Sequence, residues 1–271
     1  MRYLYYLLLV LGLFSAISVT AQRRSVDDTR LLPEVQTEVA LKGDDYLLVG
    51  LRTPLLTGTA SGVEVDRVGL NVGYERFWTQ QWSGGATLRA EFYDAYSRGG
   101  DVSKLYADVV PELFVRHWNI LGGFNFRQRL GVEYYIPGGE SSESRAITRL
   151  RLDMDRVIPL GEHTAIRPRI AYEAVAYLRL QRDETKLKER VIDFGSVRAD
   201  VGVIVSPRFD FTPWVASQTN YLNALPQFDA SGNQTRGGRT NIVSPVVGLD
   251  MRLTLFRGGV PFERRQLPTQ H

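Results

Sequence analysis

The chain has 271 residues, of which 44% are hydrophobic and 23% charged, with 33 Lys and Arg against 30 Asp and Glu. A formal net charge of only +3 does not support the basic footprint of a nucleic-acid-binding protein. The absence of cysteine excludes a disulfide scaffold, thiolate metal sites and a cysteine nucleophile. This length suits one or two soluble domains, or a single membrane barrel.

The N-terminus has the pattern of an export signal. Met1 and Arg2 precede an apolar run from Tyr3 to Val19, and small residues follow up to Ala21. A short basic start, an apolar stretch and small residues at the cleavage point are typical of a secretory signal peptide. We therefore predict a signal peptide over residues 1–21, with an uncleaved anchor as the alternative. Either form takes the chain out of the cytoplasm.

Residues 22–45 decide how many strands are counted. Val35–Lys42 alternates between polar and apolar residues, and the same parity continues through Gly43 into Tyr46–Arg52. One long first strand with a bend at Gly43 gives ten strands in all. A separate strand would give eleven, which conflicts with the even number usual in bacterial barrels. We therefore predict a periplasmic segment that extends the first strand, and keep twelve strands as the alternative.

From residue 46 to residue 256, apolar and charged residues alternate with a period of two. Arg149, Arg151 and Asp153 share one parity, while Leu150 and Leu152 share the other. Successive side chains of a strand point to opposite faces, so this period predicts strands. The ten segments are Tyr46–Arg52, Val63–Trp78, Trp82–Tyr96, Leu105–Trp118, Gly122–Tyr135, Arg145–Val157, Ala165–Leu180, Val191–Ser206, Phe211–Tyr221 and Asn241–Phe256.

Most of these segments match the nine to eleven residues of a tilted membrane strand. The connections between them alternate between tight and long, and bacterial barrels have short periplasmic turns and long extracellular loops. The predicted fold is therefore an all-β, antiparallel up-and-down transmembrane β-barrel in the cell outer membrane over residues 46–256. Both termini lie in the periplasm, and residues 257–271 form a polar periplasmic tail.

One parity carries no charge in its central stretches and is predicted to face lipid, where an Arg or Lys costs about 2–4 kcal/mol. The other parity is predicted to face a polar lumen. A ten-stranded barrel is close in size to barrels filled by side chains, so paired charges favour a closed lumen. The alternative is a narrow channel or a pocket for a small polar ligand. The predicted lumen network is Arg89, Glu91, Glu112, Arg127, Arg129, Glu133, Arg149, Arg151, Asp153, Arg167, Arg169, Glu173, Arg198, Asp200, Asp250 and Arg252.

Aromatic residues gather near the two ends of the predicted strands. Such residues favour membrane interfaces, so we predict two interfacial levels. The level at the tight turns comprises Trp78, Trp82, Trp118, Trp214 and Phe256, and the opposite level comprises Tyr93, Tyr134 and Tyr177.

No motif predicts chemistry. The sequence contains no metal-binding His or Cys spacing and no nucleophile elbow. His117 and His163 both map to the tight-turn end, away from the outer rim where lipid-modifying barrel enzymes work. We therefore predict no catalytic residue, no cofactor and no metal, and keep a lipid-modifying enzyme as a third hypothesis.

Two segments suggest partners. Gly248–Phe256, with alternating hydrophobic residues and an aromatic end, resembles the terminal signal recognised by the barrel-assembly machinery. It departs from that pattern in having Val246 two positions earlier and a tail after Phe256. The charged segment Gln181–Arg190 is predicted to face solvent or lipopolysaccharide.

The Thr-Ala-Gln context at residues 20–22, the Arg-rich strands and the tail resemble small outer-membrane β-barrels of Bacteroidota-type bacteria, several families of which are domains of unknown function. The resemblance covers most of the mature chain but rests on pattern. It implies the fold and the compartment, with membrane lipid as surroundings and no functional residue.

Overall fold

The computed structural model describes residues 23–41, 45–59, 62–94, 105–139, 143–178, 190–229, 231–232 and 234–256. The side chains of residues 23, 224–228, 234–237 and 256 are outside this description. All regular structure in these ranges is β-strand, and no helix there is long and apolar enough to cross a membrane. The predicted signal peptide, the tail and Gln181–Glu189 lie outside the described residues.

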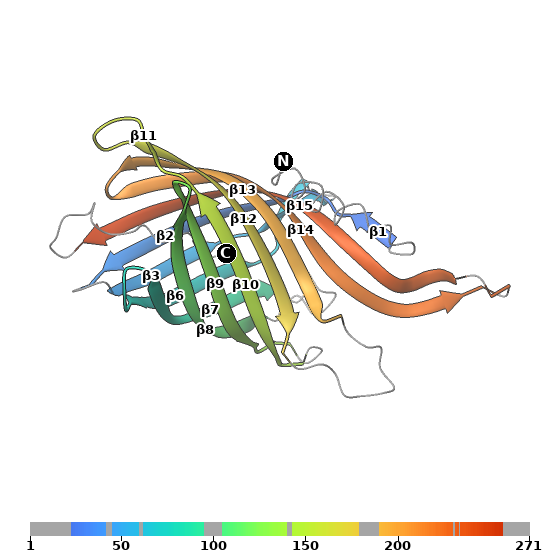
Figure 1. Ribbon diagram of the computed structural model, residues 1–271. Coiled ribbons are helices and arrows are strands. Elements are labelled where there is room, and N and C mark those ends of the chain that lie inside the picture. The colour runs from blue at the N-terminus through green and yellow to red at the C-terminus, as the bar shows by residue number, and fades with distance from the viewer. Residues whose placement is uncertain are drawn as a thin grey trace, which may run out of the picture.

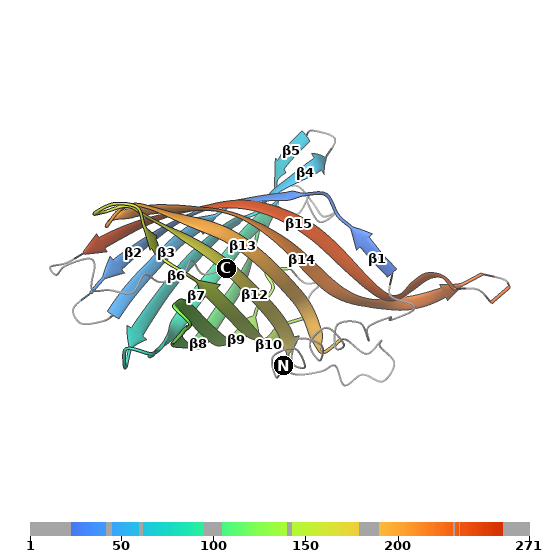
Figure 2. The same ribbon diagram turned by 45° about the horizontal axis from the view of Figure 1, so that its top comes forward.

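Eleven strands form a closed barrel (Figures 1 and 2). Each strand pairs in antiparallel fashion with the next, and β15 then closes the barrel against β2. The strands are β2 (Arg30–Ala40), β3 (Asp45–Arg52), β6 (Val68–Phe77), β7 (Trp82–Asp94), β8 (Leu105–Leu121), β9 (Phe124–Tyr135), β10 (Arg145–Asp155), β12 (Ala165–Tyr177), β13 (Ile192–Ser206), β14 (Phe209–Phe228) and β15 (Gln234–Phe256).

The predicted count of ten is wrong, and so is the alternative of twelve. β2 and β3 are separate antiparallel strands, with Glu34 opposite Arg52 and Ala40 opposite Tyr46. The chain therefore reverses between Leu41 and Asp45 instead of bending within one strand. Continuous parity could not reveal this reversal, because two strands of a hairpin can share the same alternation as one long strand.

An odd number of strands changes how the first and last strands of the barrel pair. When each neighbour reverses direction, strands one and eleven run the same way, so they can only pair in parallel. β15 and β2 do so from Val246 opposite Arg30 to Phe256 opposite Ala40. The sheet is therefore mixed, and the expected purely antiparallel topology fails at this seam. The first barrel strand begins and the last one ends at opposite ends of the barrel, which contradicts the prediction that both lie on one side.

Short connections lie at the end where β2 and β15 finish, which we call the short-turn end. They include residues 78–81, Gly122–Gly123 and residues 207–208. Gly122 and Gly123 have φ values of 57° and 84°. Positive φ at both central residues is the requirement of a type I′ hairpin turn, and glycine meets it without steric cost.

The opposite end, which we call the long-loop end, carries extra structure. β4 (Leu55–Thr59) and β5 (Gly62–Val65) form a hairpin above the rim (Figure 2). The β14–β15 hairpin extends well beyond the other strands, and β1 (Arg23–Val26) adds in parallel to β15 there (Figure 1). β11 (Ile158–Pro159) pairs with β12 near the short-turn end.

Burial is inverted relative to a soluble protein. In the described residues the buried set is mainly charged and polar, whereas large apolar side chains are exposed on the outer face of every barrel strand. A small apolar cluster of Ala40, Tyr46, Leu48 and Trp118 lies inside at the short-turn end. Exposed outer residues include Val49, Leu70, Leu88, Leu113, Leu130, Val132, Leu150, Met154, Ile170, Val197, Val201, Val215, Val247, Leu249 and Leu253.

Candidate functional site: the charged lumen

The structure places all sixteen residues of the predicted lumen network on the inner face of the barrel. The cause is the two-residue period: once one charged residue of a strand faces inward, its alternate neighbours follow. Fifteen of the sixteen, all but Arg167, take part in the ion pairs described below. Arg127 pairs with Asp155 of β10, and Arg167 lies buried nearby on β12.

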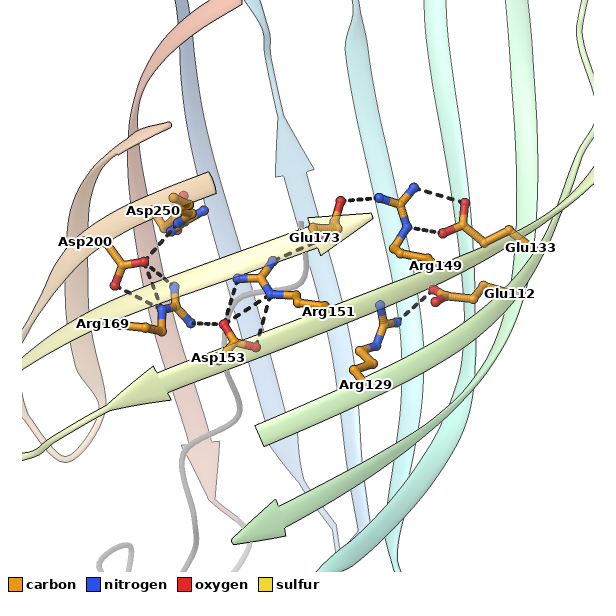
Figure 3. A network of polar contacts seen from close by, with 11 residues as sticks. Glu112, Arg129, Glu133, Arg149, Arg151, Asp153, Arg169, Glu173, Asp200 and Asp250 are labelled. Carbon is orange, nitrogen blue, oxygen red and sulfur yellow. Dashed lines mark hydrogen bonds and ion pairs between the residues drawn. The ribbon is translucent and has the colours of Figure 1, made fainter. Parts of the chain in front are cut away.

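Ten of these side chains form one continuous line of alternating charge, which Figure 3 shows from Glu133 to Asp250. Arg89 of β7 pairs with Glu133 of β9 at 3.2 Å, and Glu133 accepts a second bond from Arg149 at 3.3 Å. Arg149 also binds Glu173 of β12. Because each of these charges contacts two opposite charges, the line ties β7, β9, β10 and β12 together from inside.

The same line continues around the barrel through Arg151. Its guanidinium lies 3.8 Å from Glu173 and 3.1 Å from Asp153. Arg169 then bridges Asp153, at 3.8 Å, and Asp200 of β13, at 2.8 Å (Figure 3).

Arg198 forms the last link. It contacts Asp200 at 2.9 Å and Asp250 of β15 at 2.5 Å. Charge-assisted bonds of this kind are about twice as strong as neutral ones, and the planar fork of Arg can serve two carboxylates at once.

Separate pairs fill the other side of the lumen. Arg116 donates to both carboxylate oxygens of Glu75 at 2.9 Å, and Ser83 donates to the same carboxylate at 2.6 Å. Arg129 donates to Glu112 at 2.8 Å. A single buried charge would be strongly destabilising, whereas a hydrogen-bonded pair is tolerated.

Sequence reasoning missed Glu38, Asp210 and Arg52 as members of the network. Arg252 of β15 donates to Glu38 of β2 at 3.2 Å and to Asp210 of β14 at 2.6 Å. Arg52 binds Glu91, which also accepts from Arg67 at 2.9 Å. The predicted segments place Glu38 in the periplasmic extension and leave Asp210 between two strands. Each shares the parity of the inward residues on its strand, and this parity could have identified both as members of the network.

Three aromatic residues predicted at an outer interface point inward instead. Trp118 and Trp214 are 6% and 5% exposed, and Tyr93 is also buried. Each shares the parity of the inward charges on its strand, for example Trp118 with Arg116, so nearness to a strand end was a misleading criterion. Tyr93 donates to Asp108 at 2.9 Å.

Trp214 is part of the polar network. Its Nε1 donates to Asp250 at 2.7 Å, and its ring lies 4.1 Å from the guanidinium of Arg198. Gly248 lies opposite Trp214 in the sheet, and a Cβ at that position would come within 2.0 Å of the ring. Gly248 is therefore needed where the indole crosses the neighbouring strand.

The remaining predicted aromatic residues divide between the faces. Trp78, Trp82 and Tyr134 are exposed on the outside. Tyr177 is half-buried on the inward parity, under the guanidinium of Arg145 at 5.1 Å. The side chain of Phe256 lies outside the described residues.

Inside the described barrel, one cavity lies on each side of a packed layer. The cavity at the short-turn end has a volume of about 440 Å³ and is lined by Trp118, Arg127, Asp155 and the turn residue His163, among others. The cavity toward the long-loop end has a volume of about 160 Å³. We call the second one the arginine chamber, because five of its lining residues are Arg52, Arg89, Arg149, Arg151 and Arg198.

The two cavities share no lining residue. On β10, Arg151 lines one and Asp155 the other, so Asp153 lies between them. On β12, Arg169 lies between Glu173 and Arg167 in the same way. We call the residues at this level the central layer; all are at least nine-tenths buried, and they are Arg116, Asp153, Arg169, Asp200, Asp210, Asp250 and Arg252.

The described residues contain no group of three or more His, Asp or Glu side chains arranged to hold a metal ion. His117 lies on the outer face, where Nδ1 is 2.8 Å from Gln128 Oε1 and the ring lies 4.3 Å from that of Trp82. His163 is an exposed turn residue. The two histidines therefore do not share a site.

Comparisons with known proteins give no relative: no protein-family model, no curated protein and no solved structure matches the chain. The resemblance to Bacteroidota-type barrels therefore remains a prediction from the sequence pattern.

Proposed function

We propose that this protein is an outer-membrane β-barrel with a closed, salt-bridged lumen, and that its role is structural or interactive and not catalytic. The observation that carries the proposal is the inverted burial. Charged residues fill the interior, while the outer faces of the strands present leucine, valine and isoleucine.

A lipid environment accounts for this inversion. Leu113, near the middle of β8, is 70% exposed, and it belongs to an apolar surface that surrounds the whole barrel. Soluble monomers rarely expose continuous apolar patches of more than a few hundred Å². Closure also satisfies the backbone, since a closed barrel has no free sheet edge to place in hydrocarbon.

The central layer supports a closed lumen. Its side chains interlock through ion pairs, and the cavities on either side have no lining residue in common. Passage of a solute would require these pairs to separate, and separating desolvated charges costs several kcal/mol per ion.

Export through the signal peptide, insertion by the barrel-assembly machinery and contact with lipopolysaccharide complete the proposal. They rest on residues 1–21, Gly248–Phe256 and Gln181–Arg190.

The decisive experiment uses the full mature chain refolded in detergent. We expect heat-modifiable migration in gels, resistance of the native protein to carbonate extraction, and no stable conductance in planar bilayers. Ohmic steps would replace the closed lumen with the narrow-channel hypothesis. Recovery of the native protein as a soluble periplasmic species would refute the membrane assignment.

A further inference from the structure

The lumen as a whole holds both charges, but the arginine chamber is strongly asymmetric. Five guanidinium groups line it, and Glu173 is the one carboxylate on its wall among the described residues. The other carboxylates that pair with these arginines do not line the chamber. Glu133, for example, serves both Arg89 and Arg149. The chamber itself is therefore bounded mainly by cationic nitrogen atoms.

Three of these arginines, Arg52, Arg89 and Arg198, have a buried nitrogen without a hydrogen-bond partner, and only in Arg198 is it a terminal guanidinium nitrogen. Arg198 is only 5% exposed, and its Nε and Nη2 donate to Asp200 and Asp250. Its Nη1 is buried without a hydrogen-bond partner. In a planar guanidinium, Nη1 faces away from the edge formed by Nε and Nη2. A buried donor without an acceptor is destabilising, so this position favours an added acceptor.

Glu173 presents the complementary feature. Its Oε1 binds Arg149, whereas its Oε2 is buried and accepts no hydrogen bond, although Arg151 Nη1 lies 3.8 Å away. The wall of one chamber thus offers both a charged donor and a charged acceptor. A ligand that satisfies both needs an anionic oxygen and a hydrogen-bond donor, and five neighbouring guanidinium groups favour a neutral donor such as a hydroxyl over an ammonium group.

We propose that the arginine chamber binds a small hydroxylated oxyanion, with its anionic oxygen on Arg198 Nη1 and its hydroxyl donating to Glu173 Oε2. The chamber volume of about 160 Å³ suits hydrogen phosphate or a short hydroxycarboxylate and excludes a nucleotide or an oligosaccharide. Arginine is well suited to such recognition because its donors match the geometry of phosphate and carboxylate oxygens.

The first test is calorimetric titration of the refolded mature chain with inorganic phosphate, sulfate, glycolate and acetate near neutral pH. Phosphate and glycolate should bind with one-to-one stoichiometry, and about tenfold more tightly than sulfate and acetate, which lack the hydroxyl donor. Equal affinity within each matched pair would overturn the assignment of Glu173. Absence of phosphate and glycolate binding would overturn the site itself.

Two variants assign the binding to this chamber. Arg198→Gln should weaken phosphate binding by at least about tenfold, because it removes a charge-assisted hydrogen bond. Since the same change disturbs two ion pairs, Ala216→Met provides a second route: Ala216 lines the chamber, and the longer side chain fills it without altering any charge. Ala199→Met on the outward face of β13 is the matched control.

We expect Ala216→Met to abolish phosphate binding and Ala199→Met to retain it, with heat-modifiable migration unchanged in both. Unchanged phosphate affinity in a folded Ala216→Met protein would overturn the proposal. This inference rests on the barrel and not on the membrane or on conductance. If the protein proved soluble, the same titration in plain buffer would test the chamber while the membrane assignment failed separately.

Discussion

Arg252 Nη1 of β15 donates to Glu38 Oε1 of β2 at 3.2 Å, across the parallel seam that closes the barrel. The two side chains come from the first and last strands of the barrel and are 214 positions apart in the sequence. Both are almost completely buried, and Arg252 also binds Asp210 of β14. One guanidinium therefore joins the last two strands to the first one.

Glu38→Gln should destabilise the barrel by about 1–3 kcal/mol, because Arg252 loses a charged acceptor in a buried site while retaining Asp210. Urea unfolding of the refolded protein, followed by gel migration, measures this change. Glu64→Gln on the exposed β5 is the control and should leave the midpoint unchanged. Equal stability of the two variants would show that the seam pair contributes nothing.

Leu113→Arg distinguishes a lipid-facing surface from a water-facing one. Leu113 is 70% exposed, so an arginine there would be harmless in water, but near the bilayer centre it should cost about 2–4 kcal/mol. Leu105→Arg is the matched control, since Leu105 is 72% exposed but begins β8 at the long-loop end. Unfolding from lipid vesicles should show a clear loss of stability for Leu113→Arg and none for Leu105→Arg. Similar unfolding of both variants would contradict the lipid-facing assignment.

Removing a neutral pair from the central layer should open the lumen. Arg169 and Asp200 are paired at 2.8 Å, and changing both to alanine leaves the net charge unaltered. We expect the double variant to show conductance steps in planar bilayers that the parent lacks. Alanine at Asp66 and Arg67, paired at 2.7 Å outside this layer, should not conduct. A folded Arg169–Asp200 double variant without conductance steps would show that another part of the lumen blocks passage.

Fluorescence quenching by brominated lipids tests the orientation of the tryptophans. Trp78 and Trp82 are 61% and 43% exposed on the outer face, whereas Trp118 and Trp214 are enclosed. In proteins that retain one tryptophan each, the lipids should quench the first two much more strongly. Strong quenching of Trp214 alone would contradict its inward placement.

Cysteine labelling tests the number of strands. Because the natural sequence has no cysteine, each introduced cysteine is the single thiol that a maleimide can label. Asp28 precedes β2, Glu64 lies in the β5 hairpin and Glu162 lies in a turn at the short-turn end. With eleven strands, a membrane-impermeant maleimide applied to intact cells should label Asp28→Cys together with Glu64→Cys, but not Glu162→Cys. A barrel whose first strand started on the periplasmic side would protect Asp28→Cys along with Glu162→Cys.

The alternation along each strand is enough to predict which charged side chains face inward. Strand geometry gives successive side chains opposite directions, so the alternation around Arg149, Arg151 and Asp153 identified the inner face without knowledge of any neighbour. The same rule, applied to Trp118 and Trp214, would have placed both inside. Their position near strand ends suggested otherwise, but position along a strand does not set the direction of a side chain.

The number of strands, the closure of the barrel and the partner of each charge depend on contacts between segments that are distant in the sequence. A reversal between Leu41 and Asp45 preserves the parity, so no local pattern separates one bent strand from two paired ones. Parity also leaves open which carboxylate meets which guanidinium. The bond from Arg252 to Glu38 depends on the register of two strands at opposite ends of the chain, and that register exists only once the barrel has closed.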